Sequence, residues 1–337
     1  MKRVFSMVVV LTMAIMGYSQ SRLIATLSHN GEISAFYGAS AFQEAYEASQ
    51  HGDIITLSSG TFAPVDIKKA LTIRGAGMYV DSVTHILPTV ITSNFTIEIP
   101  DSIEQHLTME GIYYNNNTIY VKGTLKEASF QKCRLNNFFY SDVSSTKIDK
   151  LTFVHCKITK GISLPKTAFA SFINSYVANP RTNSSASSNM DFLNCVVEVE
   201  HVSSSLYYSS LTNCIIRHTR ADNPSLPSSS TALHCLGIGN TTMFSYATNI
   251  ESTMFAGELS ELFKTYTGTY DDNETFELTD VAKIKYLGND LKQIGMYGGN
   301  MPFNPNATNP RIVKCDVASE STADGKLSVD IEVSSAE

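Results

Sequence analysis

Apolar residues recur at a short, fixed spacing through the middle of the chain. Five segments share an apolar first residue, Cys or Ser at the fourth position and an apolar residue at the sixth. They begin at Phe130, Phe153, Phe172, Phe192 and Leu211. Weaker copies begin at Ile73, Met109, Ala232 and Ile250. From Met109 onward the starts lie 18 to 23 residues apart, and the 36 residues after Ile73 leave room for one unrecognised copy. A repeat of this length predicts stacked coils that bury their apolar faces against one another.

The alternation within each copy predicts two strands joined by a bend. Residues two apart on a strand face the same side, so the first, fourth and sixth positions all point inward only if the chain bends at the third. Asn174, Asn194 and Asn213 occupy that position, and Gly75 and Gly111 occupy it in weaker copies. Asn and Gly tolerate the left-handed backbone that such a bend requires. Units of this kind, stacked about 4.8 Å apart, make a parallel β-helix.

The predicted fold class is therefore all-β: a single-stranded right-handed parallel β-helix, a solenoid of about ten coils. Residues 40–49 have the pattern of an amphipathic helix, and we expect an N-terminal α-helical cap there because a solenoid needs covered ends. Residues 20–300 are expected to form the β-helix domain with its cap. Residues 301–337 are expected to form a C-terminal linker and short strands.

Five of the six cysteines occupy the inward fourth position of the repeat, and Cys315 stands outside it. These five are Cys133, Cys156, Cys195, Cys214 and Cys235. The pattern favours a stack of buried free thiols, because parallel side chains on neighbouring coils fit disulfide geometry poorly. Disulfides stay open as the alternative, since an exported protein meets an oxidising environment.

Residues 1–19 have the pattern of a secretory signal peptide. Lys2 and Arg3 precede an apolar run over residues 4–16, and Gly17 and Ser19 are the small residues expected before a cleavage site. The run is too short to span a bilayer, so no membrane span is expected after cleavage. The predicted location is the periplasm, the outer surface or the extracellular space.

The charge balance excludes some classes of function. The chain has a net charge of −7, and charged residues make up 17% of it. This composition argues against a general nucleic-acid binder, whose binding face is basic, and against a coiled coil. No cofactor and no metal are predicted, and the oligomeric state is left open.

Four segments carry a resemblance to a known family. They are residues 25–31 (ATLSHNG), 52–62 (GDIITLSSGTF), 70–77 (ALTIRGAG) and 294–299 (IGMYGG). They resemble secreted right-handed parallel β-helix proteins of the pectin-lyase-like superfamily, and more narrowly an uncharacterised Bacteroidetes-type branch. The resemblance spans roughly residues 22–337 and implies the fold and secretion. It implies no single activity, because the superfamily holds lyases, hydrolases, esterases, adhesins and scaffolds.

The catalytic motifs of the superfamily's enzymes are missing. The galacturonase-like Asn-Thr-Asp, Asp-Asp and Gly-His-Gly pattern does not occur, and the Trp-containing motifs are impossible without Trp. The sequence thus favours an exported, non-catalytic glycan-binding or surface-interaction protein that contacts a polysaccharide or cell-surface glycan. A divergent polysaccharide lyase or glycoside hydrolase acting on an acidic glycan is the alternative, and a structural envelope protein is a further one.

The repeat register brings three cationic or titratable residues to one offset. Arg181, His201 and Arg220 each lie nine residues after the start of a copy, so they are expected to form a column on successive coils. Such a column can bind carboxylates or sulfates, and ordinary surface charge is the alternative interpretation. Glu198 and Arg217 share offset six, which predicts an ion pair across two coils.

Other candidates lie in loops. Tyr207 and Tyr208 border Ser-rich stretches that are expected to form a polar recognition edge. Ser82 and Ser102, each between an Asp and an aliphatic residue, are similar to O-glycosylation sites of Bacteroidetes-type exported proteins.

Two histidines and one acidic stretch contain residue types that commonly bind metals. His155 and His234 occupy the bend position, where a structural role is favoured over metal binding because no second ligand follows at close spacing. Asp271, Asp272 and Glu274 are interpreted as a solvated loop rather than a calcium site.

Overall fold

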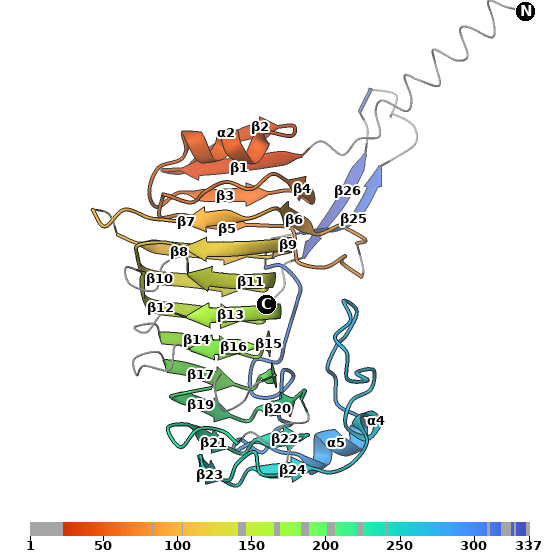
Figure 1. Cartoon of the computed structure of the whole chain (residues 1–337). Coiled ribbons are helices and arrows are strands. Elements are labelled where there is room, and N and C mark those ends of the chain that lie inside the picture. The colour runs from red at the N-terminus through yellow and green to blue at the C-terminus, as the bar shows by residue number, and fades with distance from the viewer. Residues whose placement is uncertain are drawn as a thin grey trace, which may run out of the picture.

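The computed structural model describes residues 23–308, 311–317, 325–326 and 328–334, apart from gaps at 83, 103, 141–145, 165–168, 183–188, 201–205, 221–224 and 240. The predicted signal peptide lies outside the described residues. The described chain forms a parallel β-solenoid of about 8 turns, built from two long sheets (Figure 1). Most turns contribute one short strand to each sheet.

The first sheet starts with an antiparallel pair and continues as a parallel ladder. In sheet order its strands are β2 (Glu32–Tyr37), β1 (Ile24–His29), β3 (Ile54–Leu57), β5 (Thr72–Arg74), β8 (His106–Glu110), β10 (Thr124–Gln131), β12 (Lys147–Val154), β14 (Phe169–Ile173), β17 (Asn189–Leu193), β19 (Ser209–Thr212), β21 (Thr231–Leu233) and β23 (Thr248–Ile250).

The second sheet is parallel throughout. In sheet order its strands are β24 (Thr253–Phe255), β22 (Leu236–Ile238), β20 (Ile215–His218), β18 (Val196–Val199), β15 (Tyr176–Ala178), β13 (Lys157–Leu164), β11 (Arg134–Tyr140), β9 (Ile112–Val121), β6 (Thr89–Thr92) and β4 (Gly60–Phe62). Two further strands lie beside this path: β7 (Phe95–Ile97) pairs with β9, and β16 (Pro180–Thr182) pairs with β13.

The interior of the solenoid follows the predicted repeat. The first position pairs coil to coil from Phe130 through Phe153, Phe172 and Phe192 to Leu211. The four Phe rings stack with centroids 5.2, 5.1 and 4.7 Å apart. All five residues are buried, so the register that places aromatic rings over one another also fills the core.

The predicted bend at the third position is confirmed. Asn174, Asn194, Asn213, Lys132 and His155 have φ between 45° and 55° there. Each bend N–H donates to the next coil, as from Asn174 to the Leu193 carbonyl at 2.9 Å.

Gly75 departs from this pattern, because its φ is not positive. A Cβ at Gly75 would lie 2.4 Å from the Gly111 carbonyl oxygen, so the close approach of two backbones requires glycine at this position.

Two details of the predicted register are wrong. No copy lies between Ile73 and Met109 in the first sheet, because β5 pairs directly with β8; the intervening residues supply β6 and β7 to the second sheet. The last copy begins at Asn249, which pairs with Ala232, and the bend falls at Glu251 with φ 53°. Ile250 therefore takes the second, outward-facing position, in register with Leu233, and is 45% exposed.

The five repeat cysteines are buried and free. Each thiol lies within hydrogen-bond distance of backbone carbonyls, as Cys156 Sγ does at 3.3 Å from the Phe130 oxygen. Ser175 takes the same position, and its hydroxyl donates to the Ile173 carbonyl at 2.8 Å. In these six copies the fourth position thus holds a small side chain whose donor meets a backbone carbonyl.

Helix α2 (Ala41–Ala48) packs against β1, β2 and β3 and buries Phe42 and Tyr46. Two short helices, α4 (Leu259–Leu262) and α5 (Asp280–Lys285), lie in the C-terminal part of the chain. No described helix combines the length and apolar character needed to cross a membrane. β25 (Arg311–Val317) and β26 (Val329–Ser334) form a separate antiparallel pair.

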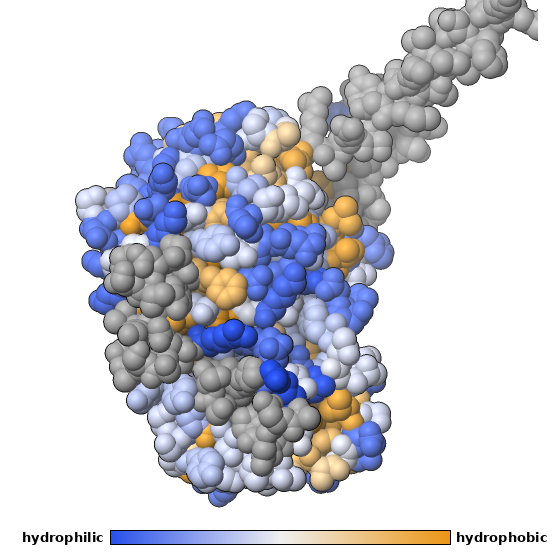
Figure 2. Space-filling view, viewed as in Figure 1, coloured by the Kyte–Doolittle hydropathy of each residue, from blue (hydrophilic) through white to orange (hydrophobic). Residues whose placement is uncertain are grey.

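Residues 256–308, here called the covering segment, fold back along the outer face of the second sheet, beside the lower coils in Figure 1. Phe263, Tyr266 and Phe276 pack there in a second apolar core with Val196 and Ile215. Over the end of the solenoid where α5 lies, hydrophobic side chains gather at the lower right of Figure 2, and α5 exposes Val281 and Ile284. Nothing in the repeat pattern predicted this second core.

The bend residues hold the covering segment in place. Asn174 Nδ2 donates to the Met296 and Gly298 carbonyls, both at 2.8 Å, and Asn213 Oδ1 accepts from the Asn289 N–H at 2.9 Å. Asn at the bend thus supplies both the left-handed backbone and an amide that docks the returning chain.

Candidate functional site

The fifth position of the repeat forms a column on the outer face of the second sheet. The register runs from coil to coil through Tyr113, Arg134, Lys157, Tyr176, Val196, Ile215 and Leu236. The covering segment packs on the apolar half, from Tyr176 onward. The half with two cations, Arg134 and Lys157, borders a cavity.

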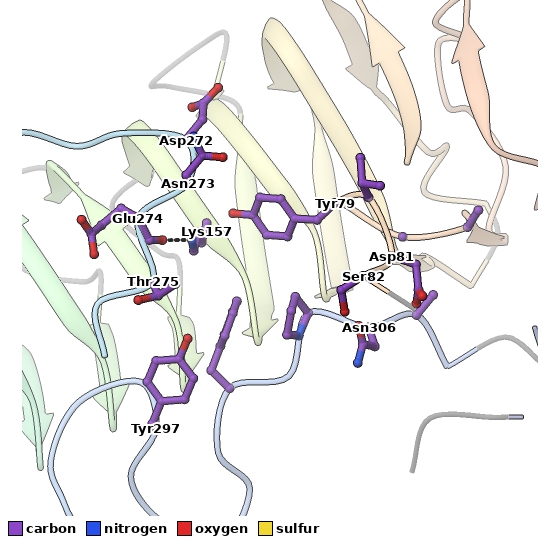
Figure 3. A pocket seen from close by; sticks show the side chains of 16 residues that line it. Tyr79, Asp81, Ser82, Lys157, Asp272, Asn273, Glu274, Thr275, Tyr297 and Asn306 are labelled. Carbon is purple, nitrogen blue, oxygen red and sulfur yellow. Dashed lines mark hydrogen bonds between the residues drawn. The ribbon is translucent and has the colours of Figure 1, made fainter. Parts of the chain in front are cut away.

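This cavity, called the Lys157 cavity below, has a volume of about 510 Å³. It lies between the loop of residues 76–82, the Lys157 side chain and two parts of the covering segment, residues 272–275 and 297–307 (Figure 3). Three aromatic side chains line it, from Tyr79, Tyr297 and Phe303. Hydroxyl, amide and carboxyl groups from other lining residues, among them Ser82 and Asn306, complete its wall.

Lys157 is the buried cation of this cavity. The residue is 3% exposed, and its ammonium donates to the Glu274 carbonyl oxygen (Figure 3). The ammonium also lies 5.0 Å from the Tyr79 ring centroid and 5.9 Å from that of Phe303. Burial, with Arg134 nearby as the second cause, lowers the pKa of Lys157 to about 8.

The carboxylates nearest to Lys157 are engaged elsewhere. Asp272 pairs with the buried Arg134, which holds the pKa of Asp272 below its ordinary value. The Glu274 carboxylate accepts from Thr265 Oγ1 at 2.7 Å and from the Phe276 N–H at 2.9 Å. The interpretation of this stretch as a solvated loop is therefore wrong for Glu274, which is buried because its carboxylate organises the turn of the covering segment.

Arg134 lies among tyrosines. Its guanidinium is 4.2 Å from the Tyr113 ring centroid and 5.8 Å from that of Tyr79. Burial raises the pKa of Tyr270 to about 12 and raises the pKa of Tyr79 further, so both phenols are neutral. The two hydroxyls face each other beside Arg134.

A second cation, the half-buried Arg217, lies on the same face of the sheet, at the seventh position of its copy. Arg217 Nη1 is 2.5 Å from Glu198 Oε1, which confirms the predicted ion pair across two coils. Tyr176 and Tyr266 both donate to the Glu198 carboxylate, and Arg217 also bonds the Tyr266 hydroxyl at 2.5 Å. This charge is paired, and Tyr266 of the covering segment bonds to both of its members, so the pair contributes to the packing of that segment.

The predicted cationic column is only partly described. Arg181 is exposed, with its guanidinium 4.0 Å from Glu200, and Arg220 is exposed at the end of β20. His201 lies outside the described residues. Neither arginine lines the Lys157 cavity, so the column stays a prediction about a different place on the surface.

The other predicted residues are dispersed. Tyr208 is 41% exposed at the turn before β19, where its N–H donates to Ser229 Oγ at 3.2 Å, and Tyr207 beside it is half-buried. Ser82 and Ser102 are both exposed, and Ser82 lines the Lys157 cavity. O-glycosylation at the two serines and a recognition edge at the tyrosines stay predictions.

The two bend histidines have structural contacts. His155 Nε2 lies 3.1 Å from the Met301 carbonyl oxygen, and His234 Nε2 lies 3.1 Å from a Glu251 carboxylate oxygen. Within the described part of the chain, no group of three or more His, Cys, Asp or Glu side chains is placed to hold a metal ion.

Comparisons of the chain with protein-family models, with curated proteins and with solved structures found no match. The resemblance to the pectin-lyase-like superfamily therefore stays a prediction.

Proposed function

We propose that the protein is an exported, non-catalytic glycan-binding protein that takes part of a saccharide in the Lys157 cavity. The observation that carries this proposal is the composition of the cavity wall. A volume of about 510 Å³ is within the range of small-ligand sites. Tyr79, Tyr297 and Phe303 offer faces for the apolar side of a sugar, and hydroxyl and amide groups offer partners for its hydroxyls.

We propose in addition that the solenoid is a right-handed parallel β-helix of about ten coils, with α2 as its cap, of the pectin-lyase-like type. We also propose that it is exported to the periplasm, the outer surface or the extracellular space. A small cavity with aromatic and polar groups, on the side of a long solenoid, suits a protein that binds one part of an extended glycan and leaves the rest outside.

One observation favours the enzymatic alternative, a divergent lyase or hydrolase. A buried lysine with a pKa of about 8 carries a neutral amine in part of the molecules near neutral pH, and general bases are tuned in this way. A structural envelope protein is the third possibility, and a cavity of this composition gives it no support.

A single experiment separates these functions. The mature protein, residues 20–337, is incubated with a panel of acidic and neutral glycans, and retention and released oligosaccharides are read together. We expect retention without release. Release of products that is lost in Lys157→Met would replace the binding function by the enzymatic one. If the protein neither retains nor degrades any glycan, the binding function and the enzymatic function are both refuted, and the structural role is favoured.

A further inference from the structure

The Lys157 cavity contains a buried positive charge whose counter-charge is missing. Lys157 is almost fully buried, and only one contact of its ammonium is a hydrogen bond to a described residue, the Glu274 carbonyl. An ammonium has three N–H donors. Within the described ranges, no carboxylate oxygen lies at ion-pair distance from Lys157 Nζ. Buried charges in proteins are nearly always paired, because desolvation of a single ion is costly.

Each nearby acidic group is committed to another partner. Asp272 pairs with Arg134, and the Glu274 carboxylate points away from Lys157 toward Thr265 (Figure 3). Asp81, across the cavity, accepts from the Thr84 N–H at 2.7 Å. Rotation of any of these carboxylates toward Lys157 would break an interaction that holds the covering segment or the loop of residues 76–82.

We propose that an oxyanion carried by the bound ligand, a carboxylate or a sulfate ester, is the counter-ion of Lys157. This inference rests on the proposed saccharide binding and narrows it to acidic saccharides. The oxyanion accepts from the free N–H donors of Lys157, and the Tyr79 ring beside them limits water. Charge-assisted hydrogen bonds in such surroundings are strong, so an acidic sugar should bind about tenfold to a hundredfold more tightly than its neutral counterpart.

The site should also couple binding to protonation. Without ligand, the groups that act on Lys157 are Arg134, which lowers its pKa, and Glu274 and Asp272, which raise it; burial outweighs them. A ligand anion beside the ammonium raises the pKa of Lys157 again. Above about pH 8 the free protein has lost this proton, so ligand binding takes a proton up from the buffer.

The test measures affinity at pH 6.5 for glucose, glucuronic acid, glucose 6-sulfate and inorganic sulfate, using the mature protein. We expect both acidic sugars to bind about tenfold to a hundredfold more tightly than glucose. Lys157→Met should remove the preference, and Lys157→Arg, which keeps the charge, should retain part of it. Lys160→Met is the matched control, because Lys160 is exposed on the same strand and lies outside the cavity.

A second readout needs no variant. Calorimetry of glucuronic acid at pH 8.5 in two buffers of different ionisation enthalpy should show proton uptake. Equal binding of glucose and the acidic sugars, or a preference that Lys157→Met leaves intact, overturns the inference and leaves saccharide binding standing. Lys157-dependent binding of inorganic sulfate with no binding of any sugar overturns the proposed function and leaves the anion site. Binding of none of the four probes overturns both.

Discussion

Arg217 and Lys157 are two cations on the outer face of the same sheet, and the same covering segment lies over both. Arg217 is paired with Glu198, and two tyrosine hydroxyls complete the group. Lys157 has a carbonyl oxygen and aromatic rings as neighbours, and a cavity opens beside it. A paired charge contributes to the packing of the covering segment. The unpaired charge lowers stability in the free protein and is therefore the better candidate for ligand binding.

The largest expected effect comes from breaking the paired charge. Glu198→Gln leaves Arg217, which is only 17% exposed, without a carboxylate, and we expect the free energy of unfolding to fall by about 3 kcal/mol. Denaturation by urea measures it. Glu200→Gln is the matched control, since Glu200 meets the exposed Arg181 at 4.0 Å and its loss should cost less than about 0.5 kcal/mol. Equal effects of the two substitutions would show that Arg217 is not desolvated.

Removal of the unpaired charge of Lys157 should raise the free energy of unfolding. Lys157→Met replaces an ammonium without a carboxylate by an apolar chain of similar length, and we expect a gain of about 2 kcal/mol at pH 7. The same urea titration measures it. A loss of stability comparable to that of Glu198→Gln would mean that Lys157 is paired in solution and would remove the basis of the comparison.

The pH dependence of the wild-type protein sharpens this result. The pKa of Lys157 is about 8 in the folded chain and 10.5 without perturbation, so between these values the unfolded chain binds more protons. Stability from this group therefore rises with pH over that window. The advantage of Lys157→Met should shrink from pH 8 to pH 10.5. An advantage that is constant with pH would contradict the lowered pKa.

The smallest effect is expected at the edge of the cavity. Asp272→Asn removes the carboxylate of Arg134, but Asp272 is 63% exposed and water replaces part of the lost interaction. We expect a loss of about 1 kcal/mol in unfolding free energy. Because Asp272 also raises the pKa of Lys157, the variant should deprotonate Lys157 at lower pH, which a pH titration of stability measures. An unchanged titration would show that Asp272 does not influence the pKa of Lys157.

The fold was largely accessible from the sequence, whereas the site was not. The first, third, fourth and sixth positions of the repeat gave the strands, the bend and the inward thiols, because a local period fixes which side chains share a face. The repeat pattern placed no requirement on the residue at the fifth position, so it predicted nothing there. This position carries cations at Arg134 and Lys157 and apolar residues at Val196 and Ile215. An apolar residue on the solvent side of successive coils is the signal that another part of the chain covers this face.

Residues 256–308 show why this signal was not enough. Their apolar residues have no regular period, so nothing local assigns them to a partner surface, and Asp272 and Glu274 have the composition of a solvated loop. Their partners Arg134 and Lys157 lie more than a hundred positions earlier in the chain. The sequence by itself determined the repeat, the stacked core and the bends, since these depend on contacts between neighbouring coils. Only the tertiary structure decided which charges are buried and which of them is left unpaired, because desolvation depends on what covers a side chain.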